Sequence, residues 1–257
     1  MPSNIRIIPR LDIKGDNLIK GIHLEGLRVI GKPNDYAYQY YKDGADEIIY
    51  MDIVASLYGR NNLESIIKKT VKDIFIPITV GGGIRDIDDI STMLRAGAEK
   101  VAINSAITRN PDLITKAARK FGSQCIVASI EAKKNQHSWE VMIENGREKT
   151  GINAIDWAKK VNILGAGEIL VTSIDMEGTK KGFDNQLVND ISSSVDIPVI
   201  ASGGMGTIKD GVEVIQDSSA DAVAIANVLH YKKLSIAEIR KVFKENGINI
   251  RDYNAKS

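Results

Sequence analysis

The chain has 257 residues, of which 43% are hydrophobic and 26% charged, and this composition supports a large apolar core. Its 34 Lys and Arg residues nearly balance its 33 Asp and Glu residues, so no net charge attracts it to nucleic acid or to a membrane surface. No apolar stretch approaches the roughly 18 residues of a membrane span, and a single cysteine cannot form an internal disulfide. These features predict a cytoplasmic protein.

Short β-branched runs alternate with longer amphipathic segments along the whole chain. The predicted strands cover residues 6–9, 47–53, 76–80, 100–104, 125–131, 168–174, 197–201 and 221–226. Between them, apolar residues recur at three- and four-residue steps, which predicts helices at 63–74, 87–97, 111–122 and 154–165. Eight strands that alternate with helices predict parallel pairing, and a length of roughly 250 residues suits a TIM (β/α)8 barrel. A doubly wound open sheet is the alternative.

The two halves of the chain repeat each other. "IPITVGGGIR" (76–85) returns as "IPVIASGGMG" (197–206), and "GADEIIYMDI" (44–53) returns as "GAGEILVTSI" (165–174), both 121 residues later. "RLDIK" (10–14) matches "SIEAK" (129–133) at an offset of 119, and "AGAEKVAIN" (96–104) loosely matches "SSADAVAIAN" (218–227). Four matches in the same order predict one domain, 1–257, made of half-barrels at about 1–122 and 123–257.

A glycine pair follows the third strand of each predicted half. Glycines there let backbone N–H groups approach an anion, although a tight turn is the simpler interpretation. Each pair is echoed after the next strand by a second small or polar pair. We call Gly82, Gly83, Asn104 and Ser105 the first-half grip, and Gly203, Gly204, Ala226 and Asn227 the second-half grip. Because these loops share the C-terminal face of a barrel, we expect two phosphate sites and a bisphosphorylated ligand.

One carboxylate residue ends the first strand of each half. Asp12 and Glu131 are expected on opposite sides of the barrel mouth, where a pair of carboxylates suits general acid and general base catalysis. A lone carboxylate at a strand end is more often a hydrogen-bond acceptor for a loop, but the duplication favours a catalytic pair. Lys20, in the Gly-rich first loop, either clamps the ligand or is solvated.

Four charged residues stand at strand starts, at the opposite end of the predicted barrel. Their signs alternate around the ring, in the order Arg6, Glu47, Lys100 and Glu168. The residues alone favour a structural plug of salt bridges over a gate to a passage through the barrel.

Other reactive residues give weaker signals. Cys125 falls inside a predicted strand and is expected in the core. His23, His137 and His230 do not have the spacing of metal ligands. The sequence therefore predicts neither nucleophilic catalysis nor a metal site.

Five stretches together resemble the cyclase subunit of imidazole glycerol phosphate synthase, and the similarity extends over about residues 5–250. They are "RIIPRLDIKGDNLIKG", "VGGGIRDIDDISTMLRAGAEKVAINSA", "FGSQCIVASIEAK", "WAKKVNILGAGEILVTSIDMEGTKKGFD" and "IPVIASGGMG". The resemblance implies a duplicated TIM barrel that works as a heterodimer with a glutaminase subunit. That family joins ammonia from the glutaminase to a bisphosphorylated ribulosyl substrate. Its products are imidazole glycerol phosphate and aminoimidazole carboxamide ribotide, and it uses no cofactor.

The resemblance also implies roles for single residues. The catalytic carboxylates correspond to Asp12 and Glu131. The residues that bind substrate or phosphate correspond to Lys20, Gly83, Asn104, Ser105, Glu177, Gly178, Gly204, Ala226 and Asn227. The ring at the barrel floor, which the residues alone assign to a plug, corresponds to the family's ammonia gate: Arg6, Glu47, Lys100 and Glu168.

The mouth departs from the family pattern at several positions. Glu131 replaces an aspartate, Arg10 replaces a small residue, and Asn227 replaces a common serine. Glu99 and Glu177 also stand where the family has aspartate. These departures leave a second interpretation open, a paralogue that uses ammonia from a partner to amidate a sugar or sugar nucleotide for surface polysaccharides. The sister isomerase of the pathway and a scaffold that only activates a glutaminase are further alternatives.

Overall fold

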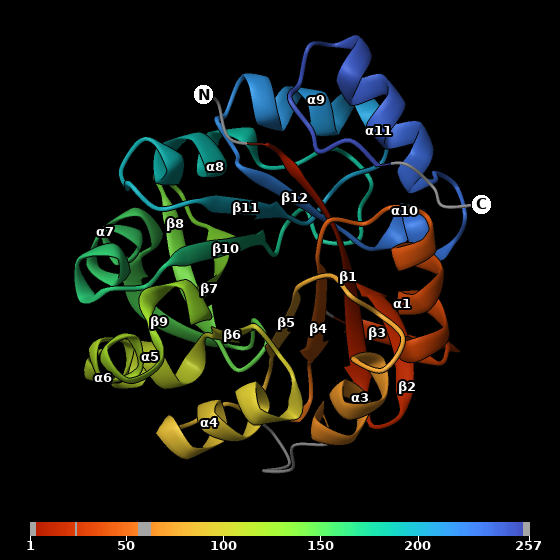
Figure 1. The fold of residues 1–257 in the computed structure, drawn as a ribbon. Coiled ribbons are helices and arrows are strands. Elements are labelled where there is room, and N and C mark those ends of the chain that lie inside the picture. The colour runs from red at the N-terminus through yellow and green to blue at the C-terminus, as the bar shows by residue number, and fades with distance from the viewer. Residues whose placement is uncertain (1–3, 24, 56–62, 254–257) are drawn as a thin grey trace.

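A computed structural model describes residues 4–23, 25–55 and 63–253. Eight parallel strands form a closed barrel with the helices outside it (Figure 1). In spatial order the strands are β1 (Arg6–Lys14), β4 (Ile48–Asp52), β5 (Ile78–Gly81), β6 (Lys100–Ile103), β7 (Ile126–Lys134), β10 (Glu168–Ser173), β11 (Val199–Ser202) and β12 (Ala222–Ile225). β12 pairs with β1 and β7 pairs with β10, so the sheet has no open edge between the halves. The predicted TIM barrel is confirmed, and the open sheet is wrong.

Helices follow the barrel strands at each predicted position. They are α1 (Pro33–Lys42), α3 (Leu63–Thr70), α4 (Ile87–Ala96), α5 (Ser105–Arg109), α6 (Asp112–Phe121), α7 (Ala154–Leu164), α8 (Asn185–Ser192), α9 (Ile208–Gln216), α10 (Asn227–His230) and α11 (Ile236–Glu245). Side-chain caps explain several starts, because Asp86 accepts hydrogen bonds from the first turn of α4 and Asn153 does so for α7. Within the described ranges, none of the helices has the length and apolar character needed to span a membrane.

Two antiparallel hairpins, which the sequence analysis did not predict, extend the barrel at its mouth. β2 (Asn17–Ile22) and β3 (Glu25–Gly31) follow β1, whereas β8 (Trp139–Ile143) and β9 (Glu148–Asn153) follow β7. They occur at equivalent places in the two halves, so the duplication includes them. The predicted Gly-rich first loop is therefore largely strand. Cys125, predicted in a core strand, ends a short 3-10 helix before β7 and is only half-buried.

Alternate residues of each barrel strand face the barrel interior, as the two-residue period of a strand requires. The interior is therefore built in layers along the barrel axis. Above the charged floor lies an apolar layer that contains Ile8, Ile49, Val127, Leu170 and Ile200, all almost fully buried. The next inward position on β1, after Ile8, is Arg10, and the one after that is Asp12. From the floor of the barrel to its mouth, the layers are therefore charged, then apolar, then polar.

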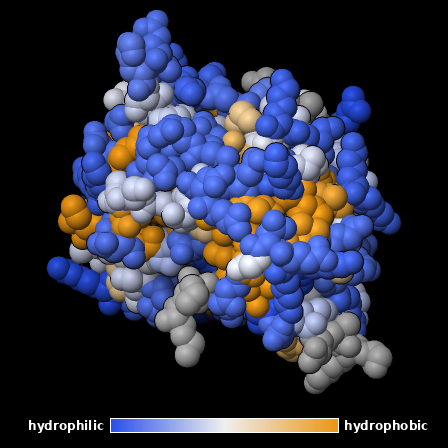
Figure 2. Space-filling view, turned by 90° about the horizontal axis from the view of Figure 1, so that it is seen from above, coloured by the Kyte–Doolittle hydropathy of each residue, from blue (hydrophilic) through white to orange (hydrophobic). Residues whose placement is uncertain are grey.

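A second, larger apolar core lies between the strands and the helices, with Tyr50, Trp157 and Phe243 among its largest buried side chains. The outer surface is mainly hydrophilic, and Figure 2 shows one face on which hydrophobic residues gather in a limited patch. The exposed large apolar side chains of the described residues include Phe75 and Ile163. The core therefore accounts for most of the apolar sequence.

Candidate functional site

Asp12 lies at the end of the barrel interior and is almost completely buried. Its Oδ1 accepts a bond of 2.9 Å from Arg10 Nε, and its Oδ2 accepts one of 3.2 Å from Lys20 Nζ. Burial alone would raise the pKa of Asp12, but the charges of Arg10 and Lys20 outweigh it and hold the pKa below its usual value. Asp12 is therefore a fixed carboxylate with both oxygens paired.

Glu131 has a different environment, although it occupies the equivalent position of the second half. Its Oε2 is buried and has no hydrogen-bond partner among the described residues. Burial raises the pKa of Glu131 to about 7, against the charge of Arg10 and a backbone bond from Gly146, which both lower it. A carboxyl group with this pKa exchanges its proton near neutral pH, which suits general acid–base catalysis.

Lys20 lies on β2 and is buried, so it is not the solvated side chain that the sequence left open. Its ammonium group bridges Asp12 and Glu177. Burial lowers the pKa of Lys20, but the two carboxylates raise it more, so the net pKa is above its ordinary value. The structure therefore connects the predicted catalytic aspartate to the predicted Glu177 through one cation.

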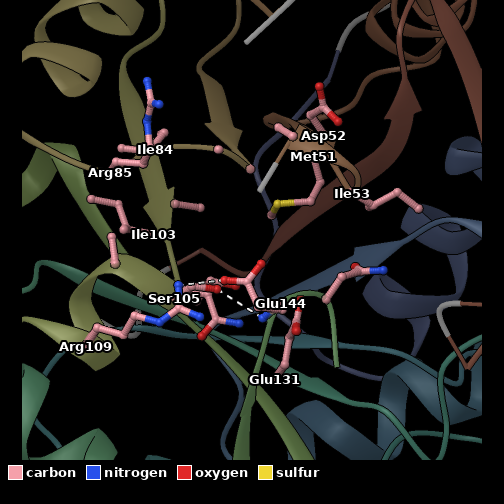
Figure 3. Close-up of a pocket in the computed structure, with 18 of the residues that line it drawn as sticks. Met51, Asp52, Ile53, Ile84, Arg85, Ile103, Ser105, Arg109, Glu131 and Glu144 are labelled. Atoms are coloured by element: carbon pink, nitrogen blue, oxygen red, sulfur yellow. Dashed lines mark hydrogen bonds and ion pairs between the residues drawn. The ribbon is translucent and has the colours of Figure 1, made fainter. Parts of the chain in front are cut away.

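The first-half grip lines an open cavity of about 380 Å³. Gly83, Asn104 and Ser105 all contribute to its wall, as the sequence predicted, and Glu131 reaches it from β7. Figure 3 shows Ser105, Glu131 and Glu144 on one side of this cavity, across from residues of β4. The grip and one candidate catalytic carboxyl therefore face the same space.

The second-half grip has almost no free space. Its cavity has a volume of about 20 Å³ and is lined by Arg10, Lys180, Ser202, Met205 and the predicted residues Glu177, Gly178, Gly204, Ala226 and Asn227. The structure thus brings the predicted residues of each grip together. It also shows a difference between the halves that the sequence did not predict.

Each hairpin contacts predicted binding residues of the other half. From the second half, Met142 O accepts a 3.1 Å bond from Asn104 Nδ2, and the Glu144 N–H donates to Ser105 Oγ at 3.1 Å. From the first half, the His23 N–H donates to Glu177 O at 2.9 Å, beside the ion pair between Lys20 and Glu177. These contacts are therefore exchanged between the two halves.

Arg109 adds a charge contact to one of these hairpins. Its guanidinium lies 2.7 Å from Glu144 Oε1 and 3.2 Å from Glu148 Oε2, and both carboxylates belong to the β8–β9 hairpin region. Arg109 also lines the first-half cavity. Nothing in the α5 sequence distinguishes Arg109 from a solvated arginine, so its role could not be predicted from the sequence.

Arg10 is the second residue whose place the sequence did not predict. Its Nη1 donates to Thr172 Oγ1 at 2.9 Å and to Ser202 Oγ at 3.1 Å, so its side chain crosses from β1 to β10 and β11. Behind it, His230 Nε2 lies 3.0 Å from the Arg10 carbonyl, and His230 Nδ1 lies 2.6 Å from the Tyr40 hydroxyl. Burial lowers the pKa of His230 to about 4, so the ring is neutral and donates to Arg10 O.

The four charged residues at the barrel floor form a closed ring of ion pairs. Lys100 Nζ lies 2.9 Å from both Glu47 and Glu168, and Arg6 contacts the same two carboxylates. Both glutamates are almost fully buried. Arg6, Lys100 and Glu168 also line an outer cavity of about 280 Å³ on this face. The four predicted residues therefore form one ring of ion pairs, which borders this outer cavity.

Among the residues that the structure describes, no cluster of three or more His, Cys, Asp or Glu side chains could hold a metal ion. The mouth presents its buried carboxylates, Lys20 and Arg10, together with the backbone of the two grips.

Comparisons with known proteins agree with the fold and with the motifs. A profile of the family described as "Histidine biosynthesis protein" matches residues 6–235. The chain is 65% identical over 209 residues to "Imidazole glycerol phosphate synthase subunit HisF" of Legionella pneumophila, which covers 81% of this chain and 99% of that protein. Proteins of the same name from Clostridium botulinum (strain Okra / Type B1) and Dehalococcoides mccartyi (strain BAV1) are 49% and 46% identical over 248 residues, which is 96% of this chain and 98% of each.

Proposed function

The chain belongs to the histidine biosynthesis protein family, among the HisF subunits of imidazole glycerol phosphate synthase, and we propose that its own mouth residues carry out the cyclisation reaction. The reaction is that of the cyclase subunit, which joins ammonia to a bisphosphorylated ribulosyl-formimino-carboxamide ribotide. It yields imidazole glycerol phosphate and aminoimidazole carboxamide ribotide.

One observation carries the assignment of the site. Two buried carboxyl groups come from equivalent strands of the two halves. Glu131 lines the first-half cavity, and Asp12 is bonded to Arg10, which lines the second-half cavity. The grips would hold the two phosphate ends of the substrate through backbone N–H groups. The reacting centre would then lie between Asp12 and Glu131. Since each hairpin contacts predicted binding residues of the other half, we propose that residues 1–257 act as one domain.

The two carboxyl groups have unequal roles in this proposal. Glu131 exchanges protons with the substrate, because one of its oxygens has no partner and its pKa is about 7. Asp12 remains ionised and stabilises positive charge that develops on the substrate, since Arg10 and Lys20 hold its pKa low. Lys20 orients Asp12 and is near enough to the second-half grip, through Glu177, to contact the bound substrate.

Ammonia would reach the mouth from the opposite end of the barrel. The ring of Arg6, Glu47, Lys100 and Glu168 lies at the floor, below an apolar layer that a neutral ammonia molecule would cross more readily than ammonium. The outer cavity beside the ring supports docking of a glutaminase subunit on this face, as a heterodimer. In this role the ring is a gate as well as a plug.

The test is cyclisation of the bisphosphorylated substrate by the purified chain, with an ammonium salt at high pH and no partner subunit. We expect imidazole glycerol phosphate to form, and Asp12→Asn to abolish its formation. Activity that appears only in Glu131→Asp would instead indicate that the mouth has been adapted to another acceptor. Glu245→Gln, an exposed substitution on α11, is the matched control.

A second candidate function is favoured by one feature of the mouth. Arg10 and the small second-half cavity suit an acceptor with a single phosphate end, such as a sugar derivative that is amidated with ammonia from a partner. The assay above separates the two candidates, because an amidating enzyme would not cyclise the bisphosphate.

A further inference from the structure

The two halves of the mouth differ at one pair of equivalent positions. In the repeat of "RLDIK" and "SIEAK", Arg10 matches Ser129. Ser129 lines the first-half cavity of about 380 Å³, whereas Arg10 lines the second-half cavity of about 20 Å³. The larger side chain therefore belongs to the grip with the smaller space.

The Arg10 side chain is held in place from several directions. Asp12 binds its Nε, and the hydroxyl groups of Thr172 and Ser202 both accept from its Nη1. The neutral ring of His230 fixes its backbone carbonyl. A guanidinium that is 97% buried and bonded to three strands is a defined part of the mouth, because such a group is costly to bury without these partners.

The volume of the second-half cavity sets a limit on what can enter it. A space of about 20 Å³ accommodates roughly one water molecule. A phosphate group has five heavy atoms and needs more room than this, and Arg10 is one of the side chains that narrow the space. The first-half cavity has no such limit, since it is more than ten times larger.

We propose that Arg10 is a specificity-determining residue that closes the second-half grip of the free protein, so that a phosphorylated ligand binds first through one phosphate in the first-half grip. The inference rests on the proposed use of the grips as phosphate sites. A second phosphate enters when the guanidinium turns from Asp12 to the incoming anion, for which arginine is a strong partner. A ligand with a single phosphate leaves Arg10 on Asp12. Only a bisphosphorylated ligand then frees Asp12 from this partner.

Inorganic phosphate is the probe, with no substrate, ammonia or partner subunit present. Calorimetric titration counts the bound ions, and crystals soaked in phosphate locate them. We expect one phosphate per wild-type chain, beside Gly83 and Ser105, and two per Arg10→Ser chain. The reciprocal variant Ser129→Arg places the large side chain in the first half and is expected to bind none. The double variant is expected to bind one phosphate, in the second-half grip.

Several results would overturn the proposal. They are two phosphates or none in the wild-type protein, or a single phosphate in an Arg10→Ser chain whose thermal unfolding resembles the wild type. If Arg10→Ser does not fold, the soaked wild-type crystal decides the question, because it shows directly which grip is filled. A wild-type chain that fills both grips and still cyclises the substrate would contradict this inference alone. A chain that fills one grip without any cyclisation would contradict only the proposed function.

Discussion

Arg10 and Asp12 lie two residues apart on β1, face the barrel interior together and are joined by a 2.9 Å bond between Nε and Oδ1. The alternation of a strand places them on one face, and their burial makes each necessary to the other. A buried cation of β1, Arg10, is therefore bonded directly to a candidate catalytic carboxylate, Asp12.

Asp12→Asn should therefore destabilise the fold as well as stop the reaction. The substitution leaves the Arg10 guanidinium buried without its ion-pair partner, which costs about 3 kcal/mol of unfolding free energy. Urea unfolding measures this loss. In the double variant Arg10→Met with Asp12→Asn, most of the stability should return, because no unpaired charge remains. A loss below about 1 kcal/mol for Asp12→Asn would show that the pair contributes little.

Glu131 should make the protein less stable as the pH rises. Its pKa is about 7 in the folded chain and near 4.5 when exposed, so the folded state binds more protons between these values. Stability contributed by the protonated form is fully present below about pH 4.5 and is lost as the pH rises through 7, by about 3 kcal/mol in total. Urea unfolding at a series of pH values measures this contribution as the difference in stability between the wild type and Glu131→Gln. Glu245→Gln, which changes an exposed carboxylate on α11, should keep the wild-type profile.

His230 should give a pH dependence of the opposite sign. Its pKa is about 4 in the folded chain and near 6.5 when exposed, so the unfolded state takes up a proton first as the pH falls. Stability should fall between about pH 6.5 and 4, again by about 3 kcal/mol. Because Glu131 acts with the opposite sign over nearly the same pH range, His230→Gln should leave a stability that falls as the pH rises from about 4.5 to 7. His137→Gln, at an exposed position, should keep the wild-type profile. An unchanged profile in His230→Gln would mean that the pKa of His230 does not differ between the folded and unfolded chain.

At the barrel floor, Glu168→Gln should open the ring. Arg6 and Lys100 both bind Glu168, and the change leaves Glu47 as their shared anion. If the ring gates ammonia, turnover supported by glutamine and a glutaminase partner should fall several-fold, while turnover supported by ammonium salt should change little. Equal losses in both assays would contradict the gate and leave a structural role. Glu213→Gln, in an exposed surface pair with Lys209, is the control.

Gly204→Ala should disrupt the second-half grip. Gly204 has a φ of 111°, and an added Cβ would overlap the carbonyl oxygen of Gly182. We expect a loss of at least about 2 kcal/mol in thermal or urea unfolding, from backbone strain and from the overlap. Gly247→Ala is the control, because Gly247 has a φ of 73° but no atom within 4 Å of its Cβ position. Similar losses in both variants would assign the effect to backbone strain alone.

The barrel could be predicted from the sequence because its strands are apolar on both faces and its repeats are long. β4, β10 and β11 all lie within their predicted ranges to within a residue or two. The hairpins were missed because β2 and β8 extend past the barrel and mix polar with apolar residues. Their stability comes from pairing with β1 and β7, which is a tertiary effect.

The residues of the candidate site could be predicted from the sequence, but the pairing of their charges could not. Equivalent positions in the repeats were enough to find Asp12, Glu131 and the two grips. The different pairing of Asp12 and Glu131 depends on where the Arg10 side chain goes. The sequence marks Arg10 as unusual, but its contacts to Thr172 and Ser202 join strands that lie more than 160 residues away in the chain. A pattern along one strand does not contain that information.

Because the hairpins contact opposite halves, the two halves of the barrel cannot be separated or recombined independently of them. A half-barrel on its own would carry a grip and a hairpin that do not belong to each other, because Glu144 contacts Ser105 and Lys20 reaches Glu177. Two copies of the same half could restore such contacts only by crossing their hairpins, as swapped partners do. A hybrid made by joining halves from different relatives would inherit mismatched contacts. Its hairpins, more than its barrel strands, would decide whether it binds a ligand.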